Sequence, residues 1–170
     1  VKENAINRAE LTTRHDVIAA AERIHGHVVT TPVRSVIVRG VPIMLKTESL
    51  QTGGAFKLRG ATNRLLQLSP QERERGIVAF SSGNHAQGVA IAASRLGIPA
   101  TIVMPSDAPA LKVEGTRQQG ADIVFYDRGT EDRIIIATAL AQERGATLVP
   151  SFDDPHIVAG QGTTGLELLA

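Results

Sequence analysis

The chain has 170 residues, enough for one domain with its own core. Its 18 Lys and Arg residues nearly balance its 17 Asp and Glu residues, and this balance argues against nucleic acid or an anionic membrane as the main partner. It has no cysteine for a disulfide or a thiolate metal site, and no apolar stretch of the roughly 20 residues needed to span a bilayer. Since residues 1–10 also lack the apolar core of a signal peptide, we expect a cytoplasmic protein with a small-molecule partner.

The predicted secondary structure begins with a capped helix and an extended region. Thr13 and Asp16 form a variant of the capping box, and the apolar residues that follow have helical spacing as far as Gly26. An extended segment starts at Val33, and residues 42–46 have the pattern of a short buried strand.

Farther along the chain, apolar runs alternate regularly between helical and strand lengths. The expected elements, each separated from the next by Gly, Pro or Asp, are helix 57–68, strand 77–80, helix 84–96, strand 100–104, helix 110–119, strand 122–126, helix 131–144 and strand 147–149. This alternation predicts an α/β fold with an open parallel β-sheet flanked by helices. Ligands bind at the carboxyl ends of the strands in such a sheet. The loops expected there are residues 51–56, 81–85, 105–108 and 127–130.

Lys57 has a sequence setting suited to Schiff-base chemistry. Gly53 and Gly54 let the backbone approach a ligand closely, and Phe56 supplies an aromatic wall. Burial would lower the pKa of the lysine ammonium and free the amine to attack an aldehyde. The alternative is that Lys57 is a solvated charge on an amphipathic helix.

A second candidate site is the segment Ser81-Ser82-Gly83-Asn84-His85, which follows a predicted strand and opens a helix. The free N–H groups and the positive dipole end of a helix N-terminus bind carboxylate or phosphate. The alternative is that Ser82 or Asn84 only caps the helix. For His85, both catalysis as a base and a structural, hydrogen-bonding role stay open.

Two further motifs have simpler structural explanations. Asp153, Asp154 and His156 could ligate a metal ion, but their position before an apolar run is typical of a helix start, so we predict no metal site. The glycine-rich run 160–165 lacks the lysine of a P-loop and the context of a dinucleotide fingerprint.

Several motifs of the chain occur in a recognisable order. They are Phe56-Lys57 with Arg59-Gly60-Ala61, the segment 81–88, Val103-Met104-Pro105 followed by Lys112, Gly120-Ala121-Asp122, and Gly160-Gln161-Gly162-Thr163. In this order they resemble the fold-type II pyridoxal-phosphate enzymes, in particular the branch of threonine/serine dehydratases and serine racemases. The resemblance extends over nearly the whole chain.

The resemblance implies an enzyme with pyridoxal 5'-phosphate as its cofactor. Lys57 would bond to the cofactor's aldehyde and then take the Cα proton of the substrate. Phe56 would border the cofactor, and Asn84 would bind its 3-hydroxyl group. The residues that would hold the substrate carboxylate are Ser81, Ser82, Asn84 and His85. Because the cofactor is the electron sink, the protein has only to bind and orient the cofactor and substrate and to time the proton transfers.

The implied reaction is that of an ammonia-lyase, which dehydrates a β-hydroxy amino acid such as threonine or serine and releases a 2-oxo acid and ammonia. Ser82 supports serine racemase or hydroxyaspartate dehydratase as alternatives, because a hydroxyl opposite the lysine could act as a second catalytic group and return a proton to the other face of the substrate. Ala55 stands where the family commonly has Ser, which leaves the substrate preference open. A further alternative is an inactive fragment without the cofactor's phosphate site.

The resemblance also implies a domain organisation. Residues 1–170 correspond to the N-terminal half of a catalytic domain like that of the tryptophan synthase β chain. Within it, residues 53–149 would form a small subdomain, and residues 1–52 and 150–170 would belong to a large one. Since the apolar pattern stops in mid-helix at Ala170, we expect a longer protein whose phosphate loop lies beyond this residue. The family resemblance suggests a homodimer.

Overall fold

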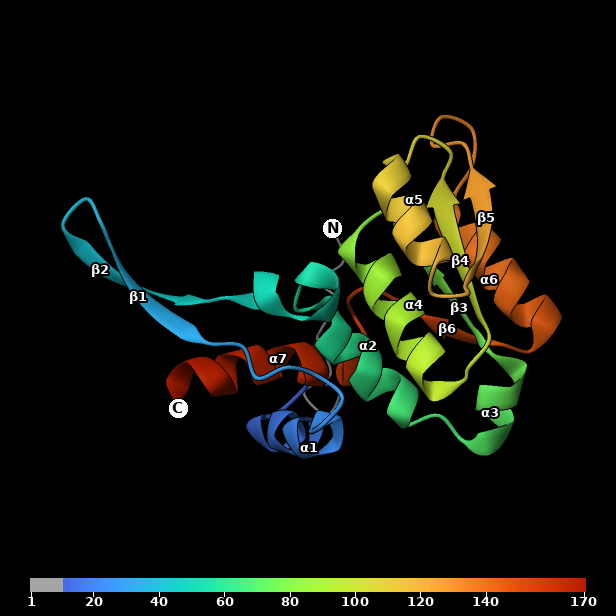
Figure 1. Cartoon of the computed structure of the whole chain (residues 1–170). Helices are drawn as coiled ribbons and strands as arrows, with labels where there is room; N and C mark the ends of the chain where they lie inside the picture. The colour runs from blue at the N-terminus through green and yellow to red at the C-terminus, as the bar shows by residue number, and fades with distance from the viewer. Residues whose placement is uncertain (1–10) are drawn as a thin grey trace, which may run out of the picture.

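A computed structural model describes residues 11–170 of the chain (Figure 1). The elements in chain order are α1 (Arg14–Ile24), β1 (Val33–Val38), β2 (Val41–Lys46), the short 3-10 helices η2 (Glu48–Leu50) and η3 (Thr52–Gly54), α2 (Lys57–Leu66), α3 (Pro70–Arg75), β3 (Ile77–Phe80), α4 (Asn84–Leu96), β4 (Ala100–Pro105), α5 (Ala110–Arg117), β5 (Asp122–Tyr126), α6 (Arg133–Arg144), β6 (Thr147–Val149) and α7 (Pro155–Leu169). The prediction for residues 1–10 falls outside the described range.

The centre of the fold is a four-stranded sheet with the strand order β5-β4-β3-β6. All neighbouring strands in it are parallel. Helices α4 and α5 lie on one face of this sheet and α6 lies on the other (Figure 1). Every residue of β3 and β4 is buried, which explains why their sequences, apart from Thr101, are apolar. The predicted α/β fold with an open parallel sheet flanked by helices is confirmed.

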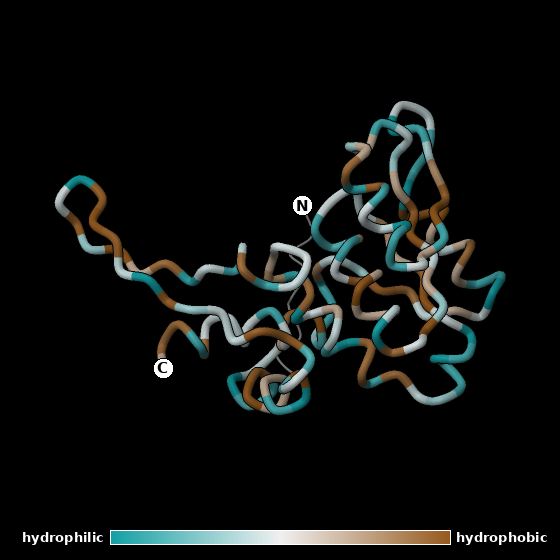
Figure 2. Tube along the Cα trace, in the orientation of Figure 1, coloured by the Kyte–Doolittle hydropathy of each residue, from teal (hydrophilic) through white to brown (hydrophobic). Residues whose placement is uncertain are grey.

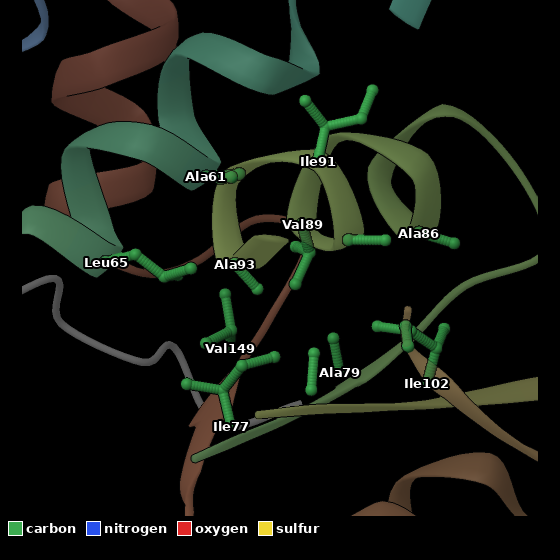
Figure 3. Close-up of a cluster of buried hydrophobic side chains, with 14 of the residues drawn as sticks. Ala61, Leu65, Ile77, Ala79, Ala86, Val89, Ile91, Ala93, Ile102 and Val149 are labelled. Carbon is green, nitrogen blue, oxygen red and sulfur yellow. The ribbon is translucent and has the colours of Figure 1, made fainter. Parts of the chain in front are cut away.

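The larger part of the hydrophobic core lies between α4 and the sheet (Figure 3). Val89 of α4 packs toward Ile77 of β3, and Ala61 of α2 joins the cluster from the other side of α4. Helices α2 and α4 approach closely because Gly88 has no side chain: a Cβ atom there would lie 3.0 Å from the backbone nitrogen of Leu58. The close approach sets the start of α2 beside α4.

A second close contact joins α2 to α7. A Cβ atom on Gly160 would lie 2.7 Å from the carbonyl oxygen of Arg59 and 2.8 Å from the Cα atom of Gly60, so only glycine fits at position 160. The guanidinium group of Arg59 is fully buried here and forms ion pairs with Glu48 at 2.8 Å and Glu167 at 2.6 Å. Because two carboxylates compensate the buried charge, this network fixes α2 against both η2 and α7.

Strands β1 and β2 form a separate antiparallel hairpin that projects away from the parallel sheet (Figure 1). The prediction of a strand at residues 42–46 is correct, but the prediction that it is buried is wrong: Met44 is 57% exposed and Leu45 44% exposed. Exposed apolar side chains occur on both faces of the hairpin. Figure 2 shows the apolar stretches along the projecting tube of the hairpin. An apolar run in a sequence indicates that burial of its side chains is favourable. It does not indicate which part of the protein packs against those side chains.

Some element boundaries differ from the predicted ones for local reasons. Helix α3 was not predicted because it has no apolar stripe, and it is stabilised instead by a capping box between Ser69 and Glu72. Helix α6 begins at Arg133 rather than residue 131 because the side chain of Asp132 accepts hydrogen bonds from the first turn. In the described part of the chain, no helix combines the length and the apolar character needed to cross a membrane.

Candidate active site

Lys57 is the first residue of α2 and follows a tight turn. Gly53 and Gly54 adopt φ angles of 78° and 69°, a region that favours glycine. One expectation needs correction, because the loop 51–56 follows the separate hairpin and not a strand of the parallel sheet. Lys57 nevertheless reaches the carboxyl edge of that sheet because α2 packs against α4 and α7.

The amine of Lys57 is held by neutral groups. Its Nζ atom donates a hydrogen bond to the carbonyl oxygen of Ser151 at 2.9 Å and lies 3.5 Å from Oε1 of Gln161. The ring centroid of Phe56 is 5.3 Å from the same nitrogen. Burial lowers the pKa of the Lys57 ammonium group. Lys57 is therefore partly buried and hydrogen-bonded, which favours the Schiff-base hypothesis over the alternative of a fully solvated surface charge.

The segment 81–85 forms the turn between β3 and α4. The amide of Ser81 donates to the carbonyl of Val103, and its hydroxyl accepts a hydrogen bond from the amide of Gly83 at 3.2 Å. Gly83 is the N-cap residue, and no side chain in residues 11–170 caps the first turn of α4. The alternative that Ser82 or Asn84 only caps the helix is therefore wrong. The first-turn N–H groups remain available at the positive end of the helix dipole.

Lys112 of α5 adds a positive charge beside this helix N-terminus. Its Nζ atom donates to Oδ1 of Asn84 and to Oε1 of Gln87, both at 2.9 Å. Because an ammonium group can only donate, the amide oxygen of Asn84 must face Lys112. The Nδ2 group of Asn84 is then free to donate a hydrogen bond to a ligand oxygen.

His85 is only 3% exposed and lies beneath the first turn of α4. Its Nε2 atom lies 3.2 Å from the carbonyl oxygen of Val149, which can only accept, so Nε2 carries the hydrogen. Burial, together with the nearby charge of Lys57, lowers the pKa of His85 to about 4, although the bond to Val149 acts in the opposite direction. The imidazole is therefore neutral at pH 7. Its Nδ1 atom is buried without a partner among the described residues.

Lys57 and His85 meet at the turn between β6 and α7. Their partners, the carbonyl oxygens of Ser151 and Val149, are separated by one residue. Strand β6 pairs with β3, so this turn and the segment 81–85 leave the sheet at the same carboxyl edge. The structure thus brings together the lysine and the predicted anion-binding segment.

The other motifs have structural roles. Asp154 caps α7 by accepting from the amides of His156 and Ile157, both at 2.9 Å, which confirms the predicted helix start. In the part of the chain that the structure describes, no group of three side chains could hold a metal ion. The run 160–165 lies inside α7, where Gly160 serves helix packing.

Sequence reasoning missed two residues of the site, Ser151 and Gln161. Ser151 contributes its backbone carbonyl, a group that every residue type has, so no side-chain signal could have identified it. For Gln161 a signal exists, because it follows Gly160 in a glycine-rich run that is not a nucleotide loop. Gly60 and Gly160 indicate a close contact between α2 and α7. Lys57 lies three positions before Gly60, so this contact brings α7 close to Lys57.

A partly buried lysine thus lies beside an uncapped helix N-terminus, at the carboxyl edge of an open parallel sheet, which is where ligands bind in folds of this class. The chain belongs to the family described as pyridoxal-phosphate dependent enzyme, whose model matches residues 24–170. The cofactor of this family, pyridoxal 5'-phosphate, fits the residues present. Lys57 offers an amine for its aldehyde, and Asn84 offers an N–H donor for one of its oxygens.

Similar proteins agree with this assignment. The L-threo-3-hydroxyaspartate ammonia-lyase of a Pseudomonas species is 54% identical over 94% of this chain and 51% of its own length. The L-threonine ammonia-lyase of Thermotoga maritima is 50% identical over 78% of this chain and 33% of its own. The structure of maize serine racemase matches with a TM-score of 0.86 and 39% identity, over 91% of this chain and 48% of that one. The chain thus spans about half the length, or less, of the relatives that it matches.

Proposed function

We propose that the full-length protein is a pyridoxal-phosphate dependent ammonia-lyase that converts a β-hydroxy amino acid to a 2-oxo acid and ammonia. The observation that carries this proposal is the meeting of Lys57 and the segment 81–85 at the β6–α7 turn, which sets a desolvated amine beside an anion-binding helix end. The ammonia-lyases among the similar proteins support it. The substrate we propose is threonine, serine or 3-hydroxyaspartate.

In this proposal each site residue has a defined task. When bound, the cofactor supplies an electron sink for the Cα carbanion. Lys57 would hold the cofactor covalently and move the Cα proton, Phe56 would border the cofactor ring, and Nδ2 of Asn84 would donate to its 3-oxygen. The residues that bind the substrate carboxylate are Ser81, Ser82, Asn84 and His85. Because the imidazole of His85 is bonded to Val149, we assign its contribution to the backbone N–H group.

Serine racemase is a second candidate because of Ser82. The hydroxyl of Ser82 makes no hydrogen bond to residues 11–170, so it is free to exchange a proton with a substrate. The similarity to maize serine racemase supports the same reading. In this case Ser82 and Lys57 would be the two catalytic residues.

The remaining parts of the proposal concern the whole protein. We propose that residues 53–149 form a small subdomain and that residues 1–52 and 150–170 belong to a large one, which the separate hairpin β1–β2 supports. From the family resemblance we propose that the phosphate loop of the cofactor lies beyond residue 170, and the helical conformation of the glycines at 160–165 supports this. We further propose a cytoplasmic homodimer with an amino-acid substrate and no nucleic-acid or membrane partner.

The test is to incubate the full-length protein and cofactor with threonine, serine and 3-hydroxyaspartate, and to measure 2-oxo acid and D-serine. An ammonia-lyase releases oxo acid from at least one of them, whereas a racemase forms D-serine. Absence of both products would refute both candidates.

Loss of the lysine amine should abolish the reaction. Lys57→Ala removes the amine, and Lys57→Arg keeps a positive charge without a nucleophilic amine. We expect both variants to lose at least about 10²–10⁴-fold in kcat, the range for a lost proton-transfer group. Borohydride reduction with bound cofactor, followed by peptide mass spectrometry, should label Lys57 in the wild-type protein and not in either variant. Normal turnover by Lys57→Ala would show that the assignment is wrong.

A further inference from the structure

The side chain of Gln161 reaches the site from α7 across a gap that a glycine leaves. A Cβ atom on Gly60 would lie 2.8 Å from the carbonyl oxygen of Ile157, and 2.9 Å from Cγ and 3.0 Å from Nε2 of Gln161. The amide of Gln161 therefore lies over the backbone of α2, three residues after Lys57. A larger residue at position 60 would therefore displace the backbone of α7 and the Gln161 side chain together.

The amide of Gln161 has a defined orientation. Its Oε1 atom lies 3.5 Å from Nζ of Lys57, while its Nε2 atom is buried and has no partner within residues 11–170. The opposite orientation would set Nε2 against the ammonium group, a donor against a donor. The orientation that satisfies the Lys57 amine therefore leaves the buried Nε2 group of Gln161 without a hydrogen bond in residues 11–170, although an unpaired buried donor is unfavourable.

We propose that Gln161 is a positioning residue that, together with the carbonyl of Ser151, directs the amine of Lys57. The inference rests on the proposed function, because it takes Lys57 as the reactive amine. A neutral amide can orient the ammonium group without the negative charge of a carboxylate. A carboxylate at this position would stabilise the charged form and reduce the fraction of free amine.

Most charged groups near Lys57 are paired with other residues, and Asp153 of the β6–α7 turn is exposed to solvent. From α4 the lysine faces the neutral imidazole of His85. In the β6–α7 turn, Asp154 caps α7 and accepts from Arg64 at 3.1 Å. The carboxylates next to α2 at Glu48 and Glu167 are paired with Arg59. Among the hydrogen bonds of residues 11–170, those from the Lys57 amine go only to the oxygens of Ser151 and Gln161.

Two substitutions of Gln161 test the proposal in opposite directions. Gln161→Glu keeps the shape and adds a charge, and Gln161→Leu removes the acceptor. The readout is the pKa of Lys57 in the cofactor-free full-length protein, measured from the pH dependence of its acetylation by acetic anhydride and read on the Lys57 peptide by mass spectrometry. We expect Gln161→Glu to raise this pKa by about one unit or more, and Gln161→Leu to lower it.

Gln67→Glu is the matched control. Gln67 ends the same helix, about 15 Å along its axis from Lys57, and its side chain donates to the carbonyl of Asn63. At this distance a new charge is largely screened, so the pKa of Lys57 should stay unchanged.

The outcomes separate this inference from the proposed function. If the pKa of Lys57 were equal in the wild type and in both Gln161 variants, the positioning role would be overturned. A pKa shift of the same sign in both variants would also overturn it, because such a shift indicates only loosened packing. If the wild-type protein fails to form a borohydride-reducible bond between cofactor and Lys57, the proposed function fails regardless of the acetylation result.

Discussion

His85 shows how one buried residue makes the stability of the protein depend on pH. In the folded protein its pKa is about 4, whereas an exposed histidine has a pKa of about 6.5. As pH falls from about 6.5 toward 4, the unfolded chain binds a proton that the folded protein does not accept. The free energy of unfolding therefore decreases as pH falls through this window.

We predict that His85→Gln removes this dependence. A glutamine can still donate from Nε2 to the carbonyl of Val149, but it does not titrate. Between pH 7 and pH 5, urea unfolding should show the wild type losing about 2 kcal/mol more stability than the variant. All other titrating groups are shared by both proteins, so the difference isolates His85. Parallel pH profiles would mean that the histidine is not held neutral.

At the residue scale, the predictable part of the site is the part that depends on side-chain type. Lys57 and the segment 81–85 were identified because an amine and a glycine-containing helix start have specific chemistry. The carbonyl of Ser151 could not be identified this way, since its position is set by the fold. The orphaned Nδ1 atom of His85 likewise depends on burial, which the sequence of one segment does not determine.

The contact between α2 and α7 should tolerate no added atom. We predict that Gly160→Ala destabilises the protein by about 1–3 kcal/mol, because its methyl group would meet the backbone of α2 at 2.7–2.8 Å. Gly165→Ala in the same helix is the control, since a Cβ atom there meets nothing within 4 Å. It should stabilise by up to about 1 kcal/mol through helix propensity.

Thermal unfolding of the two variants distinguishes the contact from a general preference for alanine in helices. The melting temperature should fall for Gly160→Ala and rise or stay constant for Gly165→Ala. If the melting temperatures of both variants changed in the same direction by the same amount, the close contact between α2 and α7 would not determine the effect of an added methyl group on stability.

At the element scale, the buried strands and the amphipathic helices were predictable because each carries its own periodicity. The predicted spans of β3, β5, β6 and α4 agree with the structure residue for residue. Helix α3 was missed because a capping box and not a hydrophobic face defines it. The packing of α2 on α7 was also missed, since it depends on glycines that a pattern of apolar residues does not register.

The hairpin β1–β2 is a feature of the whole molecule, because its apolar faces need a partner surface. Ile37 is 76% exposed and Ile43 is 38% exposed, and their cross-strand partners Pro42 and Val36 place them on opposite faces. The chain covers about half the length of the similar ammonia-lyase from Pseudomonas. We therefore expect the hairpin to be covered in the full-length protein.

Lysine substitutions test this expectation in the full-length protein. Ile37→Lys and Ile43→Lys should each lower the melting temperature, since a covered hairpin would bury the new charge. Leu111→Lys is the control because Leu111 of α5 is 80% exposed and lies outside the hairpin. Unchanged melting temperatures for both hairpin variants would show that the hairpin remains open to solvent.

The bond between Lys57 and Ser151 joins residues that are 94 positions apart in the chain. During synthesis on the ribosome, the lysine is therefore made long before the residues that desolvate and orient it. Until β6 and the start of α7 have emerged, its amine is an ordinary solvated ammonium group with little reactivity toward aldehydes. The contacts that lower the pKa of Lys57 therefore form only with long-range assembly of the chain.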